Sequence, residues 1–536
     1  MRKKWIGASV AIAALVVSAC SASKSTTTTQ AAPRTGYLAV ADTKAPAGGA
    51  LKMEVAQDVV EATGLDPQTA QLAASWQLMS MVYETLVSVG PDFAIKPGLA
   101  SSWDEKTPTE YVFHLRTDVR FTNGRAMTAD DVVGSLQRLL ASTSIWRGQL
   151  GPVKSVSKLD ASTVKVDLST PYTPFLAALA QVNAAVLPMA EVNAKSVDLT
   201  KTMLGTGPFE VTSHRQDISW TFKRNNNYWV KDKPALAEID VKVVAQEATR
   251  IADLRSGTAD VAPLDNIDSP RLLQGVPNVR VLTQASTNFY YIILNSQRPN
   301  SKLSDQRVRT ALNIALNRKQ LNEVAMGGLS KPTGVVPLGL PDSCDPASLP
   351  SATAGLDKAR QLLKDAGAEK LTIGLAIYNT EPAVAQLAQV VQQELQAIGV
   401  TVKISNMDLG AFGKAYIATP ANFDAALSWF AGYADPGMVV RWWNPDLAGF
   451  SKGFMGNDPE QDKFITAAQQ QEGAARVNAL KDLCARVDHN AEMTPLVTRP
   501  AIIGYRTDHL SPSFYAAEGY SDFWRLIADF RSLSSR

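Results

Sequence analysis

The stretch LTIGLAIYNTEPAVAQLAQVVQQELQAIGVTVKI, residues 371–404, carries the pattern that decides the fold. Apolar residues alternate over 371–377 and again over 400–404, and strict alternation predicts strands. Between these segments apolar residues recur at helical spacing over 384–398, and Gly399 ends the predicted helix. A strand, a crossover helix and a second strand imply a parallel pair of strands. The segment therefore predicts an α/β fold.

The rest of the chain continues this mixed pattern on both sides. A helix is predicted over 357–366, with Gly367 as its C-terminal stop. The N-terminal half combines helical spacing over 72–87 and 128–140 with short alternating segments. The alternating segments predict strands around residues 111–115, 164–168 and 239–243. About 490 residues follow an export leader, more than one core usually spans, so two lobes are expected.

The N-terminus predicts export and a membrane anchor. Residues 1–19 have the form of a signal peptide, because basic residues precede an apolar run over 5–17 that is shorter than the ~20 residues of a membrane span. The run ends in Val-Ser-Ala-Cys, which resembles the bacterial lipobox. That resemblance implies cleavage before Cys20 and a lipid on its sulfur, with ordinary cleavage nearby as the alternative. Residues 20–47, rich in Ser, Thr, Ala and Pro, are expected to be a flexible tether.

Composition narrows the classes of partner and cofactor. The 53 basic and 51 acidic residues are scattered, and loss of the leader changes the formal net charge from +2 to about −1. We therefore expect no nucleic-acid partner. The four histidines are dispersed, so no metal and no cofactor is expected. Cys344 and Cys484 remain after lipidation, and either a disulfide or two buried thiols would fit an oxidising exterior.

The usual catalytic signatures are missing from the sequence. It contains no His-Glu-x-x-His, no Gly-x-Ser-x-Gly and no phosphate loop, and Gly205-Thr206-Gly207 is better interpreted as a tight turn. A hydrolase would need a nucleophile with a base, or paired carboxylates. The sequence therefore predicts a binding protein rather than an enzyme, with an exported hydrolase as the alternative from another class.

Several ordered motifs point to a family. They are YETL (83–86), PGLASSW (97–103), TEYVFHLRTDVRFTNGRAMTADDVVGSLQRL (109–139), GTGPFEV (205–211), KRNNNYW (223–229) and LSDQRVRTALNIALNR (303–318). In this order they resemble the large solute-binding proteins of ABC importers, the family 5 group that includes oligopeptide- and dipeptide-binding proteins. The resemblance covers almost all of the mature chain.

The resemblance implies a two-lobed, periplasmic-binding-protein type II-like clamp of cluster C. The implied parts are lobe I from 48–286 and 496–536, its extra subdomain over 76–204, lobe II over 287–495, and hinge crossings near 286–288 and 494–497. Solute binding between the lobes would favour the closed form. The implied protein is a monomer on the outer face of the cytoplasmic membrane. It would deliver its solute to permease subunits with cytoplasmic ATPases, although the same clamp could serve a signalling receptor.

The stretch SWFAGYADPGMVVRWWNP, residues 428–445, resembles the family's segment that lines the cleft on lobe II. Tryptophan and tyrosine suit such a wall, because they offer large rigid contact area and keep a polar edge. Phe430 and one of the paired tryptophans are expected to face the core. The candidate ligand-binding residues are Trp429, Tyr433, Asp435, Trp442 and Trp443 in this segment, Trp76 and Trp146 from lobe I, and Tyr290 just past the first crossing.

One position departs from the family pattern. Gly432 stands where peptide-binding relatives carry the aspartate that holds the peptide ammonium group. Asp435 could replace it, or could instead cap the next helix. A buried ammonium without an anion is costly, so an ordinary peptide needs another acid. We expect an oligopeptide or peptide-like solute, with an oligosaccharide or other non-peptide solute as the alternative.

Overall fold

The computed structural model describes most of the chain after residue 47. The described residues are 37–39, 48–59, 64–70, 73–90, 93–141, 146–284, 286–430, 433–511, 514–515 and 534–535. Residues 34–536 form one compact unit. The predicted signal peptide, Cys20 and most of the predicted tether lie outside the described residues. Within that tether, β1 (Tyr37–Ala39) is a strand rather than coil, paired with β21 (Phe514–Tyr515). None of the described helices is both long and apolar enough to cross a bilayer.

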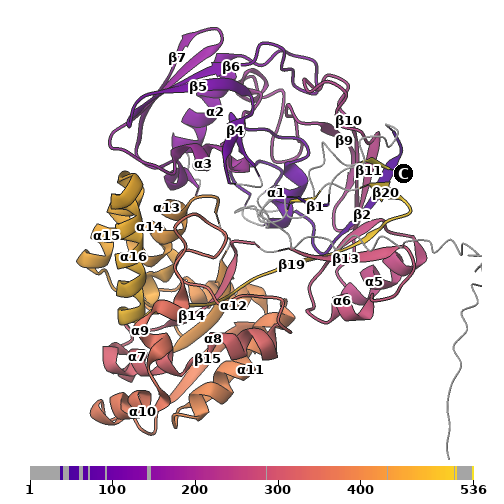
Figure 1. Ribbon diagram of the computed structural model, residues 1–536. Helices are drawn as coiled ribbons and strands as arrows, with labels where there is room; N and C mark the ends of the chain where they lie inside the picture. The colour runs from indigo at the N-terminus through magenta and orange to yellow at the C-terminus, as the bar shows by residue number, and fades with distance from the viewer. Residues whose placement is uncertain are drawn as a thin grey trace, which may run out of the picture. The chain divides into compact units, whose positions relative to one another are not determined.

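A five-stranded mixed sheet forms the centre of what we call lobe II. Its strands, in spatial order, are β16 (Thr401–Met407), β15 (Thr372–Tyr378), β17 (Ala425–Phe430), β14 (Phe289–Leu294) and β18 (Met493–Thr498). The parallel pairing of β15 with β16, joined by α11 (Pro382–Gln396), confirms the predicted strand, helix and strand. The apolar face of α11 is buried, and the helix packs against β15 and β16. Figure 1 shows α11 beside β15. Periodicity alone was therefore sufficient to locate this unit.

The remaining helices of lobe II surround this sheet. They are η3 (Lys302–Ser304), α7 (Gln306–Ala315), α8 (Arg318–Gln320), η4 (Leu321–Ala325), η5 (Pro346–Ser348), α9 (Pro350–Thr353), α10 (Leu356–Asp365), α12 (Leu409–Tyr416), α13 (Pro436–Val439), η6 (Val440–Trp443), α14 (Pro445–Ala448), η7 (Phe450–Gly453), α15 (Pro459–Gln470) and α16 (Gly473–Asn490). The helix predicted over 357–366 is α10, and Gly367 follows it with a positive φ of 57°. Cys344 is joined to Cys484 of α16 in a disulfide, with Cα atoms 6.4 Å apart.

Two further sheets belong to what we call lobe I. The larger has, in order, β13 (Val279–Gln284), β19 (Ala501–Arg506), β12 (Val261–Leu264), β2 (Ala50–Val55), β11 (Glu238–Val243), β10 (Ser219–Arg224) and β9 (Phe209–Arg215), with α5 (Glu247–Ser256) and α6 (Ser269–Leu272) nearby. The smaller has β5 (Ala100–Thr107), β6 (Glu110–Leu115), β8 (Thr163–Leu168) and β7 (Val153–Asp160). The three strands predicted in this half are confirmed as β6, β8 and β11.

Short elements accompany the smaller sheet, which lies with α2 at the top of Figure 1. They are α1 (Ala73–Met79), β3 (Val87–Val89), β4 (Ile95–Pro97), α2 (Ala129–Ala141), η1 (Arg147–Leu150), α3 (Phe175–Leu179), η2 (Val182–Ala184) and α4 (Met189–Asn193). A separate two-stranded pair, β20 (Leu510–Ser511) with β22 (Ser534–Ser535), lies near the C-terminus. The helix predicted over 128–140 is confirmed as α2.

The prediction of one helix over 72–87 is wrong beyond Met79. The backbone of Val82 instead accepts a hydrogen bond from Gly207 N at 2.8 Å. A Cβ on Gly205 would lie 2.1 Å from the Val82 carbonyl oxygen, and one on Gly207 would lie 2.6 Å from it. The two glycines of the predicted tight turn therefore allow a close backbone approach, which ends the helical pattern.

The chain passes twice between the larger sheet of lobe I and the sheet of lobe II. The first passage lies between β13 and β14, and the second lies at Arg499-Pro500, between β18 and β19. Residues 494–497, where a crossing was expected, lie inside β18. Ser286 Oγ donates to the Arg499 carbonyl at 2.8 Å, and Arg499 N donates to the Asn288 carbonyl at 2.8 Å. The two passages are therefore hydrogen-bonded side by side.

Candidate functional site

Four of the five strands of lobe II, β15, β16, β17 and β18, have their carboxyl ends on the same side of the sheet, which we call the carboxyl edge. β15 and β17 are parallel, and β14 is antiparallel to both β17 and β18, so β18 runs in the same direction as β17. In open α/β sheets this edge is where ligands bind. The edge carries Glu381 after β15, Trp429 near the end of β17, Arg499 after β18 and Tyr290 near the start of β14. We call these four residues the edge cluster.

Direct contacts join all four members of the edge cluster. Tyr290 and Trp429 are register partners across β14 and β17. The guanidinium carbon of Arg499 lies 4.3 Å from the centroid of the Trp429 ring, within the range of a cation–π interaction. Arg499 Nε donates to Glu381 Oε1 at 2.7 Å, and the Tyr290 hydroxyl donates to the same oxygen. A carboxylate, a guanidinium and an indole ring are thus fixed together at the edge.

The edge cluster is partly buried. Tyr290 is 2% exposed, whereas the side chains of Glu381 and Arg499 are 11% and 22% exposed. Burial, and next the negative charge of Glu381, raise the pKa of Tyr290 well above its ordinary value. Tyr290 therefore remains a neutral donor, while the two charged groups still reach solvent.

Aromatic rings continue from the end of β17. Phe430 stacks on Tyr291 with a centroid distance of 4.4 Å and on Trp442 at 4.9 Å. Tyr433 stacks on Trp442 with a centroid distance of 5.8 Å. Phe430 and Trp442 are both partly exposed. We call Phe430, Tyr433 and Trp442 the aromatic wall.

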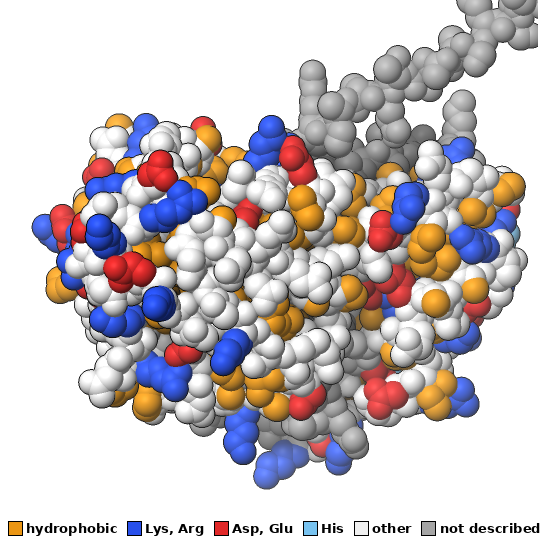
Figure 2. Space-filling model, turned by 90° about the horizontal axis from the view of Figure 1, so that it is seen from below, with side chains coloured by type: hydrophobic (Ala, Val, Ile, Leu, Met, Phe, Trp, Pro, Cys, Tyr) orange, Lys and Arg blue, Asp and Glu red, His pale blue; other side chains and the backbone are white. Residues whose placement is uncertain are grey.

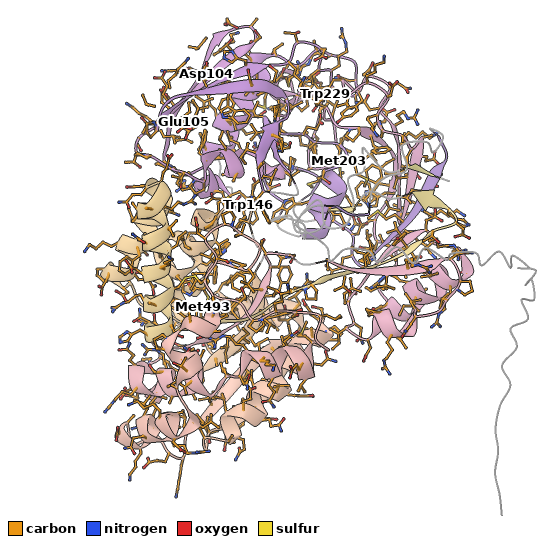
Figure 3. All side chains as sticks on the ribbon, viewed as in Figure 1. Asp104, Glu105, Trp146, Met203, Trp229 and Met493 are labelled. Atoms are coloured by element: carbon orange, nitrogen blue, oxygen red, sulfur yellow. A yellow bond between two sulfur atoms is a disulfide. The ribbon has the colours of Figure 1, made fainter. Side chains whose placement is uncertain are left out.

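Trp443 takes the core position that was expected for one of the paired tryptophans. It is 1% exposed and stacks on Phe289 with ring centroids 6.1 Å apart. Its Nε1 donates at 3.0 Å to the carbonyl of Met493, which is the first residue of β18 and is labelled in Figure 3. Trp443 therefore packs the sheet and is not part of the aromatic wall.

Asp435 is engaged by the protein itself. It is the N-cap of α13 and accepts a hydrogen bond from Gly437 N at 2.7 Å. The same oxygen pairs with Arg476 of α16. This arrangement fits the capping role that the sequence left open. Ala431 and Gly432, including the position that departs from the family pattern, lie outside the described residues.

Hydrogen bonds cross directly from lobe I to lobe II. Gln149 of η1 is 5% exposed, and its Nε2 donates to the Tyr433 hydroxyl at 3.0 Å. Asn183 of lobe I donates to Gln149 Oε1 at 2.8 Å, so the Gln149 amide is held from both sides. Burial raises the pKa of the Tyr433 hydroxyl, which therefore stays protonated. We call Gln149, Asn183 and Tyr433 the latch.

A second contact between the lobes lies close to the latch. Thr173 N donates to the Gln469 carbonyl at 2.8 Å. A Cβ on Gly437 would lie 2.6 Å from Pro174 Cγ. The glycine at the start of α13 therefore admits the lobe I loop that precedes α3.

Trp76 and Trp146, both of lobe I, pack on each other. Their rings meet edge to face with centroids 4.9 Å apart, and Trp146 Nε1 donates to the Ala70 carbonyl at 2.8 Å. Trp76 is 2% exposed, whereas Trp146, labelled in Figure 3, is partly exposed. The structure thus joins Trp429 with Tyr290, and Tyr433 with Trp442, but places Trp76 and Trp146 in a separate pair.

Sequence reasoning missed Glu381, Arg499 and Gln149. Glu381 and Arg499 had one usable signal, because each directly precedes a proline at the end of a strand pattern. Gln149 had none, since its partner Tyr433 is 284 residues away.

Two further features of the described residues bear on the kind of ligand, namely the distribution of surface charge and the placement of possible metal-binding side chains. Figure 2 shows acidic and basic side chains interspersed over the face that it draws, without a continuous basic patch there. Within the described ranges, no group of three or more His, Cys, Asp or Glu side chains is placed to hold a metal ion.

Comparisons with known proteins are consistent with this geometry. The family model of bacterial extracellular solute-binding proteins, family 5 Middle, matches residues 94–449. The dipeptide-binding protein DppE of Bacillus subtilis is 28% identical over 411 residues, which cover 70% of this chain and 74% of DppE. The glutathione-binding protein GsiB of Escherichia coli is 26% identical over 469 residues, covering 83% and 90%. The structure of Helicobacter pylori DppA in complex with the peptide STSA superposes with a TM-score of 0.77 at 22% identity, covering 90% and 98%.

Proposed function

Because the chain belongs to the bacterial extracellular solute-binding proteins of family 5, a family of binding proteins rather than enzymes, we propose that it captures an oligopeptide or peptide-like solute for an ABC importer. The solute would bind between the two lobes, against the edge cluster and the aromatic wall. Trp429, Tyr433 and Trp442 supply ring surface in this proposal, and Tyr290 acts through Glu381.

The observation that carries the peptide assignment is the charge of the edge cluster. A carboxylate and a guanidinium lie within one hydrogen bond of each other, beside an indole ring, at the ligand-binding edge of the sheet. A peptide brings an ammonium, a carboxylate and amide groups that such charges can recognise. An unsubstituted oligosaccharide brings no charge and would leave both ions without partners from the ligand.

The two passages near Ser286 and Arg499 form the hinge in this proposal. Lobe I would comprise about 48–286 and the C-terminal segment after the passage at Arg499-Pro500, with the subdomain over 76–204, and lobe II would run from about 287 to that passage, rather than to 495 as the sequence predicted. Capture closes the lobes, and the latch supplies direct contacts that only the closed form makes. Lipid on Cys20 and the tether over 20–47 would hold the protein, as a monomer, at the outer face of the membrane. Import itself requires permease subunits and their ATPases.

A second candidate solute is an oligosaccharide. The observation in its favour is the aromatic wall, in which the rings of Phe430 and Trp442 are parallel to within 5° and both are partly exposed. Flat aromatic surfaces of this kind can pack against sugar rings as well as against peptide side chains.

Equilibrium dialysis of the purified full chain distinguishes the two candidates. The chain is dialysed against an equimolar pool of tripeptides and tetrapeptides, and separately against a pool of tri- and tetrasaccharides, and retained solutes are identified by mass. Retention of peptides is the expected result. Retention of saccharides alone would contradict the proposal.

A further inference from the structure

We propose that Glu381 receives the ammonium group of the bound solute, and that Arg499 and Tyr290 are positioning residues for its carboxylate. This inference rests on the proposed function, since it names the group that selects a peptide-like solute with a free amine. It assigns to Glu381 the role that the sequence had suggested for Asp435.

Glu381 occupies the N-cap position of α11. It directly precedes Pro382 at the start of α11, yet its side chain makes no capping hydrogen bond to that helix. The carboxylate instead reaches Tyr290 of β14 and Arg499 of the second passage. It is therefore held over the carboxyl edge of the sheet by two segments that are distant in the sequence.

One oxygen of this carboxylate is left for a ligand. Both donors bind Oε1, and no described residue donates a hydrogen bond to Oε2. A carboxylate has about four acceptor positions, so Oε2 can still accept from an ammonium group. The side chain of Glu381 is 11% exposed, which gives a solute access to it without exposing the whole ion pair to water.

The surroundings hold this carboxylate in a fixed position. Arg499 pairs with Glu381 and stacks on Trp429, so the carboxylate is fixed next to the edge of the aromatic surface. An ammonium at Oε2 would form a charge-assisted hydrogen bond within a partly buried site, where such bonds are stronger than in water.

Two other acidic groups near this edge cap helices, although Asp435, like Glu381, accepts both of its hydrogen bonds on one oxygen. Asp435 caps α13 and pairs with Arg476. Asp408 follows β16, the outermost strand of the sheet, and caps α12 through a 2.8 Å hydrogen bond from Ala411 N. Glu381, in contrast, contacts Tyr290 and Arg499, the two residues that adjoin Trp429.

The test compares tripeptides with and without their amine. The purified full chain and its Glu381→Gln variant are dialysed against an equimolar tripeptide pool and against the same pool after N-acetylation. The wild-type chain should retain the free-amine pool in preference. Glu381→Gln should lower affinity for the free-amine pool by about 10- to 100-fold, the range for one hydrogen bond to a charged group, and leave affinity for the acetylated pool within about twofold.

The control is Glu323→Gln on the surface of lobe II, whose side chain is 59% exposed. It makes the same change of charge and should keep the preference of the wild type, and the unfolding midpoint of each variant reports folding. Peptide binding with the amine preference intact in Glu381→Gln would overturn this inference alone. Retention of neither pool by the wild type would overturn the proposed function together with it.

Discussion

Replacing Tyr433 by Phe should weaken solute binding without unfolding the protein. The variant removes the hydroxyl that accepts from Gln149 Nε2 at 3.0 Å across the two lobes. Gln149 is 5% exposed, so its Nε2 would be left buried without this partner in the closed form. In an open form the same amide would be hydrated, so the cost falls on closure alone.

The expected size of this effect follows from the burial of the Gln149 amide. Leaving a buried donor without its acceptor costs about 1–3 kcal/mol, which lowers the closed population and raises the apparent Kd by roughly 5- to 150-fold. Calorimetric titration with the tripeptide pool measures the Kd, and small-angle X-ray scattering without solute measures the change in lobe closure.

Tyr172→Phe is the matched control for this experiment. Its hydroxyl donates to the carbonyl of the same Gln149, at 3.4 Å, but both residues belong to lobe I. Its loss should lower the stability of lobe I and leave the apparent Kd within about twofold, since no contact between lobes is lost. A Tyr433→Phe variant with the wild-type Kd and wild-type scattering would refute the role of the latch in closure.

Three further predictions concern binding and stability. Trp429→Ala should raise the Kd for the tripeptide pool because the solute loses ring surface, whereas the lost cation–π contact with Arg499, about 0.5–2 kcal/mol, lowers folding stability; an unchanged Kd in calorimetry would exclude Trp429 from the binding surface. The double variant C344S/C484S should lose about 3–5 kcal/mol of unfolding free energy in urea, because the disulfide closes a separation of 140 residues; equal urea midpoints would contradict this. Burial and then the nearby Asp253 raise the pKa of Glu54 from 4.5 to about 7, so the folded state favours its protonated form and the stability of the wild type falls as pH rises from 4.5 through 7. The free-energy difference between Glu54→Gln and the wild type should therefore shift in favour of the variant by on the order of 3 kcal/mol between pH 4 and pH 8. Parallel pH profiles of unfolding free energy for the two proteins would contradict this.

Local periodicity predicted the parts of the fold in which neighbours in sequence pack on one another. The unit β15, α11 and β16 was located because its apolar residues repeat with strand and helix periods and a glycine ends the helix. The same reasoning failed between Met79 and Val87, where a long-range backbone contact to Gly207 outweighs helical spacing. Periodicity cannot register a contact of that kind.

In the candidate site, too, residues that are close in sequence could be predicted and partners that are distant in sequence could not. The aromatic segment after β17 was visible because its rings are close together in the sequence. The partners of those rings were not, because Glu381 and Arg499 are 118 residues apart and meet only through the order of strands in the sheet. The sequence also left open whether Cys344 and Cys484 pair, since only the packing of α16 brings their Cα atoms to 6.4 Å.

Asp435 illustrates how one residue type can carry two interpretations. The sequence allowed it to bind an amine or to cap a helix, and both readings rest on a carboxylate that accepts hydrogen bonds. The contacts with Gly437 N and Arg476, both to one oxygen of Asp435, fit the capping role. A capping carboxylate in an ion pair with a helix arginine stabilises lobe II whether or not a solute is present.

Native mass spectrometry of the full chain tests the central claim most directly. The protein is purified without added solute, transferred intact, and then activated gently so that any bound molecule is released and its mass identified. Capture of peptides or peptide-like molecules with a free amine is the result predicted from the edge cluster. Release of an uncharged oligosaccharide, with no peptide, would contradict the account.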